Sequence, residues 1–363
     1  MNLQSRNALP GRIQQWVRPG LFTRVPALRA ALGTVFIAAL LLAQVPQPDG
    51  AGVRSGVLPQ TWLTGGPKCM EVEEFRTHEY NEDFYVIRQS GCSHYEKPFL
   101  YMLFGNDKAI LFDTGAGKTN VARHVLEVRD RWLKRKGRES IPLVVAHTHG
   151  HGDHTAGDSQ FQNLPGVTFV AGTVESQKQF FGIVNWPEQF VTYDLGRRVL
   201  DIFPIPGHEQ AAIAIYDRQT GVFLSGDNLY PGRLYVSDDA AFIASTERMV
   251  KFTEGKIIAH VLGCHIEQTS TPYLEYPIGS IFQPNEAHLD MTRGHILELN
   301  EALKQFKGRK IERLAMRDFT IWPGSPSNRP IMQKWRTLTE EQQRKTMWDQ
   351  PQRQPRIPEP KPQ

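Results

Sequence analysis

The chain has 363 residues, of which 40% are hydrophobic and 22% charged, a composition that excludes a disordered chain, a coiled coil and a polytopic membrane protein. Three cysteines are too few for a disulfide-rich scaffold or a four-cysteine zinc module. The formal charge of +4 comes from the ends, because residues 1–48 carry +5 and residues 331–363 carry +3, which leaves −4 on the body. A nucleic-acid-binding function, which needs a basic face, is therefore not supported.

Residues 1–45 predict an export segment. Five arginines without any acidic residue precede an apolar run at 30–43, the order of a signal peptide. The run is shorter than the roughly 20 apolar residues that span a bilayer, and Leu41 gives a poor cleavage site after Ala43. The segment is either a cleaved signal peptide or a retained anchor in the inner membrane, and we expect a periplasmic or secreted protein.

Two further segments are predicted to lie outside the folded core. Residues 46–66 are rich in proline and glycine and predict a linker. Residues 331–363 form a tail that ends in a run rich in proline and glutamine, which predicts a flexible segment. One domain, at residues 67–330, remains between them.

Within this domain, short β-branched or aromatic runs alternate with turns. They predict strands at 84–88, 99–104, 109–112, 141–145, 167–170, 212–216, 222–224 and 257–262. Helical periodicity appears at 120–136 and 286–306. Strands mixed with helices, with hairpins and without a glycine-rich phosphate loop, predict an α+β fold of helix-covered sheets rather than a Rossmann repeat.

A dense cluster of metal-ligand residues follows the predicted strand at 141–145. His149, His151, Asp153 and His154 lie within six residues, and the interspersed glycines allow a tight turn. Imidazole and carboxylate together suit zinc, and iron or manganese also accept this ligand set. The segment therefore predicts a metal site.

This cluster matches the His-x-His-x-Asp-His signature of the metallo-β-lactamase superfamily, and the domain resembles that family in four further motifs. They are, in chain order, the Asp-Thr-Gly turn at 113–115, Pro-Gly-His at 206–208, Gly-Asp at 226–227 and Gly-Cys-His at 263–265. The resemblance covers about residues 110–270. It implies a four-layer αββα sandwich with a dinuclear metal site at one edge of the sheets.

The resemblance also implies which residues hold the ions. One ion would be held by His149, His151 and His208, the other by Asp153, His154 and His265, with Asp227 as the bridge. Neighbouring residues are left out of the ligand set: we expect Asp113 to support the ligand loop, His260 to be structural, and His147 to face the opposite side of the segment from His149.

The family's chemistry implies a hydrolase with two Zn²⁺ ions. A hydroxide that bridges the ions would attack the substrate, and Asp153 would orient it and shuttle its proton. A serine or cysteine nucleophile is not needed. A catalytic thiol at Cys264 is an alternative, but a small residue that fills the ligand loop is favoured.

The substrate is less well indicated. Zinc β-lactamases carry cysteine or serine at the position of Asp227, which argues against an antibiotic as the main substrate. Tyr230 stands where lactonases of the family have a tyrosine that binds the substrate carbonyl, and packing of a turn is an equal alternative. Arg233 and Tyr235 could bind an anionic substrate or have no role in the site.

We therefore expect an exported dinuclear zinc hydrolase that cleaves an ester, lactone or β-lactam-like bond of a small molecule. An iron-dependent oxidoreductase of the sulfur dioxygenase kind and a phosphodiesterase or sulfatase are the alternatives. Cys69 and Cys92 either form a disulfide in an oxidising periplasm or stay unpaired. The oligomeric state is open.

Overall fold

The computed structural model describes residues 52–62 and 73–323, all of which belong to one compact unit of residues 47–363. The predicted export segment at 1–45 and the predicted tail at 331–363 lie outside the described residues. In the described part, no helix has the length and apolar character needed to cross a membrane.

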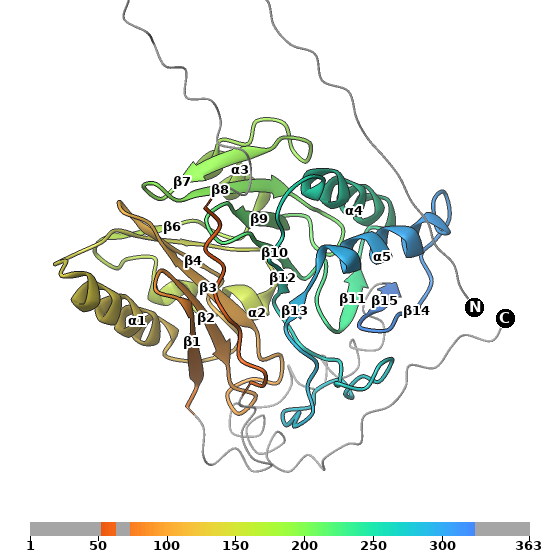
Figure 1. Cartoon of the computed structure of the whole chain (residues 1–363), viewed down its shortest axis with the longest axis horizontal. Coiled ribbons are helices and arrows are strands. Elements are labelled where there is room, and N and C mark those ends of the chain that lie inside the picture. The colour runs from red at the N-terminus through yellow and green to blue at the C-terminus, as the bar shows by residue number, and fades with distance from the viewer. Residues whose placement is uncertain (1–51, 63–72, 324–363) are drawn as a thin grey trace, which may run out of the picture. The chain divides into compact units, whose positions relative to one another are not determined.

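Two six-stranded sheets form the centre of this unit (Figure 1). The first has the order β1-β2-β3-β4-β5-β6, with bounds Phe75–Asn81, Phe84–Gln89, Phe99–Phe104, Ala109–Phe112, Leu143–Ala146 and Val167–Phe169. The second has the order β13-β12-β10-β9-β8-β7, with bounds Asp290–Met291, His260–Gly263, Val222–Gly226, Ile213–Asp217, Val199–Pro204 and Val191–Asp194.

The sheets pack face to face because alternate residues of each strand point to opposite faces. In β3, Tyr101 belongs to the core between the sheets, whereas Met102 packs in the outer core that includes α1. In β10, Leu224 faces the first sheet and Phe223 faces away from it. The central strands are therefore buried on both faces, which is why β3 and β4 are apolar throughout.

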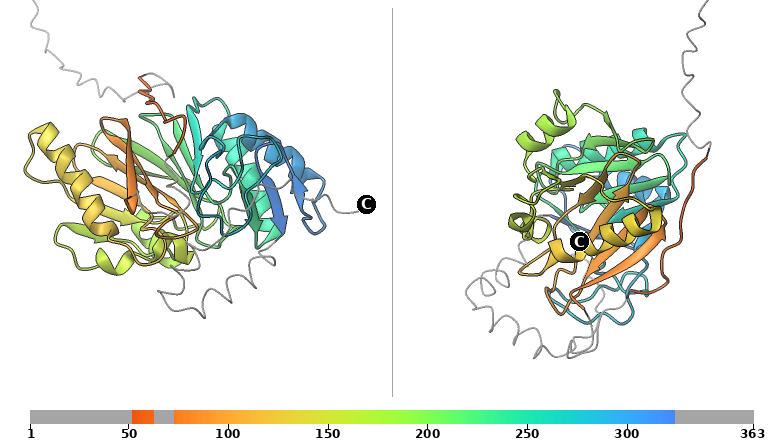
Figure 2. Two further views of the ribbon diagram at one scale, coloured as in Figure 1. Left: turned by 90° about the horizontal axis from the view of Figure 1, so that it is seen from below. Right: turned by 90° about the vertical axis from the view of Figure 1, so that its left-hand side faces the viewer.

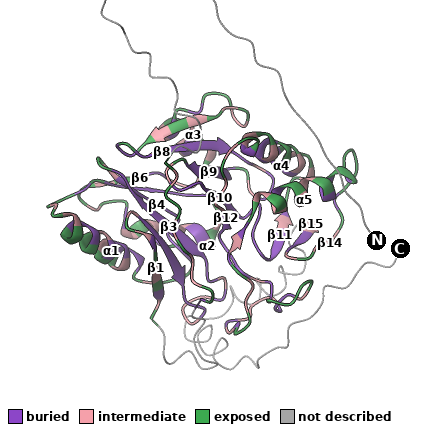
Figure 3. Cartoon of the chain, viewed as in Figure 1, coloured by how far each residue is buried: buried purple, intermediate pink, exposed green. Residues whose placement is uncertain are grey.

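Helices complete the outer layers, as Figure 2 shows from two directions. Helix α1 (Val121–Lys136) packs on the first sheet, and α4 (Asp239–Thr253) and α5 (Arg293–Lys304) pack on the second. Their outward faces are exposed, while the strands between them are buried (Figure 3). The predicted four-layer αββα sandwich is confirmed.

The remaining elements are short. Helix α3 spans Val174–Phe181, α2 spans Gly152–Thr155, and a 3₁₀ turn spans Asp158–Gln160. A small sheet has the order β11-β15-β14, with bounds Arg233–Val236, Thr320–Pro323 and Leu314–Ala315.

All predicted elements are present, most with bounds shifted by one or two residues, and two begin three or more residues later than predicted. Helix α5 begins at Arg293 instead of residue 286, because Thr292 and His295 form a capping box and the preceding Asp290–Met291 pairs with β12. Strand β12 begins at His260 instead of residue 257. Helix α4, which Asp238 caps, was not predicted.

The described part of the predicted linker packs against the domain. Residues 52–62 contain no helix or strand, yet the Trp62 side chain is buried against Phe99 in the core between the sheets. A Cβ atom at Gly56 would lie only 1.7 Å from the carbonyl oxygen of Tyr80, so only glycine fits this approach.

The cysteines are in two states. Cys92 is disulfide-bonded, and its predicted partner Cys69 lies outside the described residues. Cys264 is a buried free thiol.

Candidate metal centre

The predicted ligands follow the carboxyl ends of strands in both sheets. His149 comes after β5, which is parallel to β4, while Asp227 and His265 come after the parallel strands β10 and β12. His208 follows β8. Because strand ends of each sheet meet at a common edge, residues that are far apart in sequence converge there.

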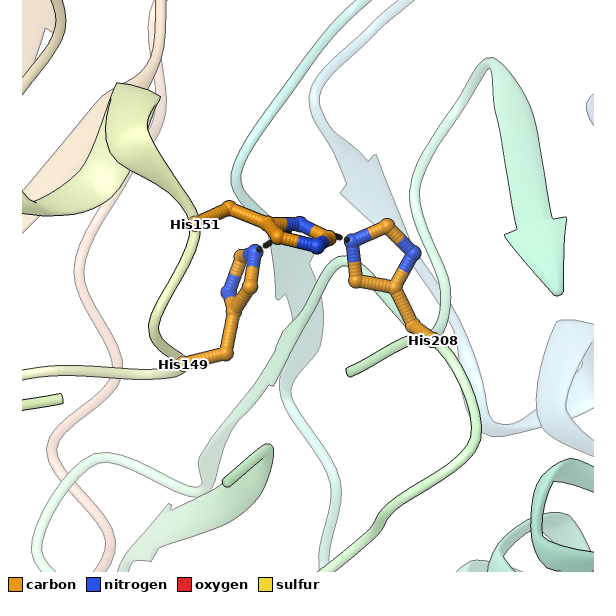
Figure 4. Close-up of side chains that lie close together, drawn as sticks. All are labelled: His149, His151 and His208. Atoms are coloured by element: carbon orange, nitrogen blue, oxygen red, sulfur yellow. Dashed lines mark hydrogen bonds between the residues drawn. The ribbon is translucent and has the colours of Figure 1, made fainter. Parts of the chain in front are cut away.

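Three histidines form the first group (Figure 4). His151 Nδ1 lies 3.2 Å from His149 Nε2 and 3.0 Å from His208 Nε2. Three ring nitrogens that converge on one point are a typical three-histidine site for a divalent cation.

The second group combines two carboxylates and two histidines: Asp153, His154, Asp227 and His265. His265 Nε2 lies 3.3 Å from His154 Nε2, and Asp153 Oδ2 lies 3.3 Å and 3.4 Å from these two nitrogens, respectively. This oxygen and nitrogen donor set suits zinc and also iron or manganese.

Asp227 lies between the two groups. Its Oδ2 atom is 3.8 Å and 3.5 Å from the Nε2 atoms of His149 and His208, and 3.6 Å and 3.3 Å from those of His154 and His265. Its Oδ1 atom is buried and has no hydrogen-bond partner among the described residues. A buried carboxylate oxygen without a hydrogen-bond partner is energetically costly. The Asp227 carboxylate therefore fits a site in which its oxygens could ligate a pair of bound cations.

Asp113 orients two ligands of the first half of the chain. Its Oδ2 accepts from His154 Nδ1 at 2.9 Å and from the Thr148 hydroxyl at 2.8 Å, and its Oδ1 accepts from the Thr148 backbone. The Thr148 oxygen is 3.1 Å from His149 Nδ1. Both rings thereby present Nε2 to the centre, which matches the predicted supporting role of Asp113.

Backbone carbonyl oxygens orient two predicted ligands that follow strands of the second sheet. His208 Nδ1 donates to the carbonyl oxygen of Tyr235 at 2.8 Å, and His265 Nδ1 donates to that of Glu96 at 2.9 Å. These bonds fix the tautomer that leaves Nε2 free as a ligand atom.

The electrostatics differ between the two groups. Burial lowers the pKa of His208 to about 4 and that of His149 well below its usual value, so both rings are neutral, as ligands must be. Burial also opposes charge on His154 and His265, but Asp227 and Asp153 outweigh it and raise both pKa values well above normal. A cation bound there would displace protons from these rings.

Comparison with known proteins agrees with this centre. Residues 98–311 match the family model described as the metallo-beta-lactamase superfamily. The chain belongs to this superfamily.

Relatives within the superfamily are hydrolases by name. The chain is 24% identical over 202 residues to the acyl-coenzyme A thioesterase MBLAC2 of Bos taurus, covering 46% of this chain and 72% of the relative. It is 29% identical over 126 residues to the hydroxyacylglutathione hydrolase of Gloeothece citriformis (strain PCC 7424), covering 32% and 48%, respectively. The present chain is a metal-dependent hydrolase of the metallo-beta-lactamase superfamily.

A solved metallo-beta-lactamase from Pontibacter korlensis is also similar, with 16% sequence identity and a TM-score of 0.43. The match covers 63% of this chain and 99% of the lactamase.

A cavity of about 480 Å³ opens beside the metal centre of this metallo-beta-lactamase superfamily member. Its volume lies within the range of pockets for small molecules. Besides ligand residues, its walls include His94, Glu96, Tyr230, Tyr235 and Glu267. His94 and the two glutamates were not predicted, because they lie outside the family motifs and no local pattern marks them.

Tyr230 and Arg233 are engaged within the protein. The Tyr230 hydroxyl donates to the Arg233 carbonyl oxygen and also lies 3.2 Å from a Glu267 carboxylate oxygen. The Arg233 guanidinium donates to Glu267, Glu275 and the Tyr235 hydroxyl. Substrate binding by Tyr230 therefore stays a prediction, and Arg233, which does not line the cavity, is held in ion pairs with Glu267 and Glu275.

His147 and His260, which are outside the predicted ligand set, contact other residues of the protein. His147 Nε2 lies 2.8 Å from Asp158, and its Nδ1 lies 2.9 Å from the carbonyl oxygen of Val170. His260 is 3.5 Å from Asp290. Among the residues that the structure describes, neither ring belongs to a group that could hold an ion.

Cys264 belongs to a third buried group, with Asp113 and the Nδ1 side of His154. Burial raises the pKa of the thiol, so the thiolate that would bind metal or act as a nucleophile is disfavoured. This agrees with a filling role in the ligand loop.

Proposed function

We propose that this hydrolase uses two zinc ions to cleave a small carboxylic ester, thioester or lactone. The observation that carries the dinuclear proposal is the position of Asp227 Oδ2 within 3.8 Å of histidines from both groups. The relatives support a carbonyl substrate, because their names specify the hydrolysis of acyl thioesters.

When bound, two zinc ions supply an activated water nucleophile and polarise the substrate carbonyl. The protein's contribution begins with Asp153, which lines the cavity. Its Oδ2 atom lies 3.3 Å and 3.4 Å from the Nε2 atoms of His265 and His154, where the carboxylate can accept a proton from the attacking water. We propose Asp153 as the catalytic carboxylate. The cavity beside the ligand groups positions the carbonyl of a small substrate.

The test is acid release on a pH-stat by the purified, zinc-loaded chain. The panel contains an aryl ester, a thioester, an acyl-homoserine lactone, a β-lactam and a phosphodiester. We expect turnover of a carboxylic ester, thioester or lactone, a large loss in His151→Ala, and retained turnover in His260→Ala, which changes a histidine outside both groups.

Equal turnover in His151→Ala would contradict the site. Turnover of only the phosphodiester would replace the carbonyl substrate with a phosphoryl one. Full zinc occupancy without any turnover, together with activity of the iron-loaded chain in a redox assay, would replace hydrolysis with the oxidoreductase alternative.

We also propose that the protein is exported to the periplasm or beyond, where its partner is a small-molecule substrate. The basic and then apolar residues 1–45 support this, as does the disulfide at Cys92, because disulfides persist in oxidising compartments. Fractionation of expressing cells and sequencing of the mature N-terminus test it. A cytoplasmic pool with Cys92 reduced would contradict it, and retention in the membrane fraction would identify an uncleaved anchor.

A further inference from the structure

The cavity beside the metal centre has an acidic and aromatic wall. Beyond the ligands, Glu96 and Glu267 line it together with the rings of His94, Tyr230 and Tyr235. Among the residues that the structure describes, neither lysine nor arginine lines this cavity. This is an unusual wall for a site that would receive an anionic substrate.

The two glutamates are in different electrostatic environments. Glu267 accepts from the Arg233 guanidinium and from the Arg233 backbone, so its charge is balanced within the protein. The side chain of Glu96 is hydrogen-bonded to the hydroxyl of Tyr95. Among the described residues, no lysine or arginine forms an ion pair with Glu96, whereas Arg233 pairs with Glu267 and Glu275. Glu96 therefore presents to the cavity a carboxyl group without a cationic partner, and burial together with Asp153 raises its pKa to about 7, so its charge is complete only above neutral pH.

The nearest lysine in sequence is turned to other partners. Lys97 Nζ donates one hydrogen bond to the carbonyl oxygen of Tyr95 and another, of 2.8 Å, to the carbonyl oxygen of Ser280. These bonds tie the segment that carries Glu96 to the loop around Ser280. The same segment supplies the carbonyl oxygen that orients His265, so Glu96 is held at a fixed place beside the second ligand group.

Resting on the proposed function, we propose that Glu96 is a specificity-determining residue and that the substrate is a small ester or thioester with a cationic nitrogen. A carboxylate in a partly enclosed cavity attracts cations and repels anions more strongly than it would in water. Aromatic rings beside it add attraction for an ammonium group. Coenzyme A and glutathione, the anionic thiol carriers named for the relatives, are disfavoured by the same charge.

The test uses three acetate esters of similar size and different charge. Acetylcholine is cationic, 3,3-dimethylbutyl acetate is its neutral isostere, and 4-acetoxybutanoate is anionic. We expect kcat/KM for acetylcholine to exceed that for the neutral ester by about tenfold or more, and the anionic ester to be the poorest of the three.

Two variants assign this preference to Glu96. In Glu96→Gln the ratio of cationic to neutral kcat/KM should fall to near one. The control Glu139→Gln, which removes an exposed carboxylate outside the cavity, should keep the wild-type ratio. A preference that persists in Glu96→Gln would overturn the inference.

A binding measurement separates this inference from the proposed function. Choline should bind the zinc-loaded chain in calorimetry and bind at least about tenfold more weakly to Glu96→Gln. Turnover of the neutral ester without any charge preference would overturn the role of Glu96 but leave the hydrolase proposal intact. If none of the esters is turned over, choline binding that depends on Glu96 would still support the cationic subsite, and its absence would overturn it.

Discussion

The two halves of the sandwich supply the metal centre in different ways. The half built on the first sheet places four predicted ligands, from His149 to His154, in the short segment after β5 that runs into helix α2. The half built on the second sheet supplies His208, Asp227 and His265 from three separate loops. The first half therefore concentrates its ligands in a local turn, and the second depends on the sheet to bring its ligands together.

The support of the ligands differs as well. In the first half a side chain, Asp113, orients His154 directly and His149 through Thr148. For His208 and His265 the orienting groups are backbone carbonyls. We therefore expect single substitutions to disturb the orientation of the first set more readily than that of the second.

The largest effect is expected at Asp227, which belongs to the second half but faces both groups. Asp227→Ala should lower the affinity for both ions and reduce turnover to less than about 1% of wild type, because Asp227 Oδ2 lies within 3.8 Å of histidine nitrogens from both groups. Metal content after dialysis and kcat/KM measure this. For comparison, His151→Ala should lower occupancy of the three-histidine site first. Two tightly bound ions in Asp227→Ala would show that the halves bind metal independently.

Asp113→Asn tests the side-chain support of the first half. We expect a loss of about 10- to 100-fold in metal affinity or activity, because the amide cannot accept all the bonds that the carboxylate does. Asp158→Asn is the matched control, since Asp158 contacts His147 and Thr114 and no predicted ligand. Equal losses in both variants would mean a general fold effect instead.

Alanine substitutions at Gly207 and Gly152 compare two ligand segments that differ in how closely other atoms approach the glycine. A Cβ at Gly207, which has φ +138°, would lie 2.4 Å from the backbone of Phe242 in α4, whereas a Cβ at Gly152 would have no atom within 4 Å. We expect Gly207→Ala to lower the free energy of unfolding by about 2 kcal/mol or more, and Gly152→Ala to change it little. Urea unfolding of both variants checks this. Similar stabilities would contradict the close approach of Gly207 to α4.

The smallest effect is expected at Cys264, which fills space where the two halves meet. Because burial raises the pKa of its thiol, iodoacetamide should not alkylate it in the folded protein, and Cys264→Ala should keep activity within a few-fold. Mass spectrometry after alkylation and a rate assay measure both. Rapid alkylation that abolishes turnover would revive a catalytic thiol.

The fold was predictable for elements whose local sequence pattern agrees with their burial in the folded protein. Helix α1 and strands β3 and β4 have the predicted bounds to within one residue, because their apolar periodicity persists over their whole length. The predicted helix at 286–306 was too long at its start, because tertiary pairing of Asp290–Met291 with β12 overrides local periodicity. Helix α4 carries a mixed apolar and polar pattern and was missed.

By itself, the sequence determined the metal-ligand chemistry and the family, because the five motifs are short, ordered and rich in histidine and aspartate. Only the tertiary structure decided what surrounds that chemistry. The Glu96 carboxyl group without a cationic partner, the ion pairs that occupy Arg233 and the position of Asp227 between four histidines all join residues from different loops. Such contacts depend on the packing of two sheets, and a local sequence pattern does not encode them.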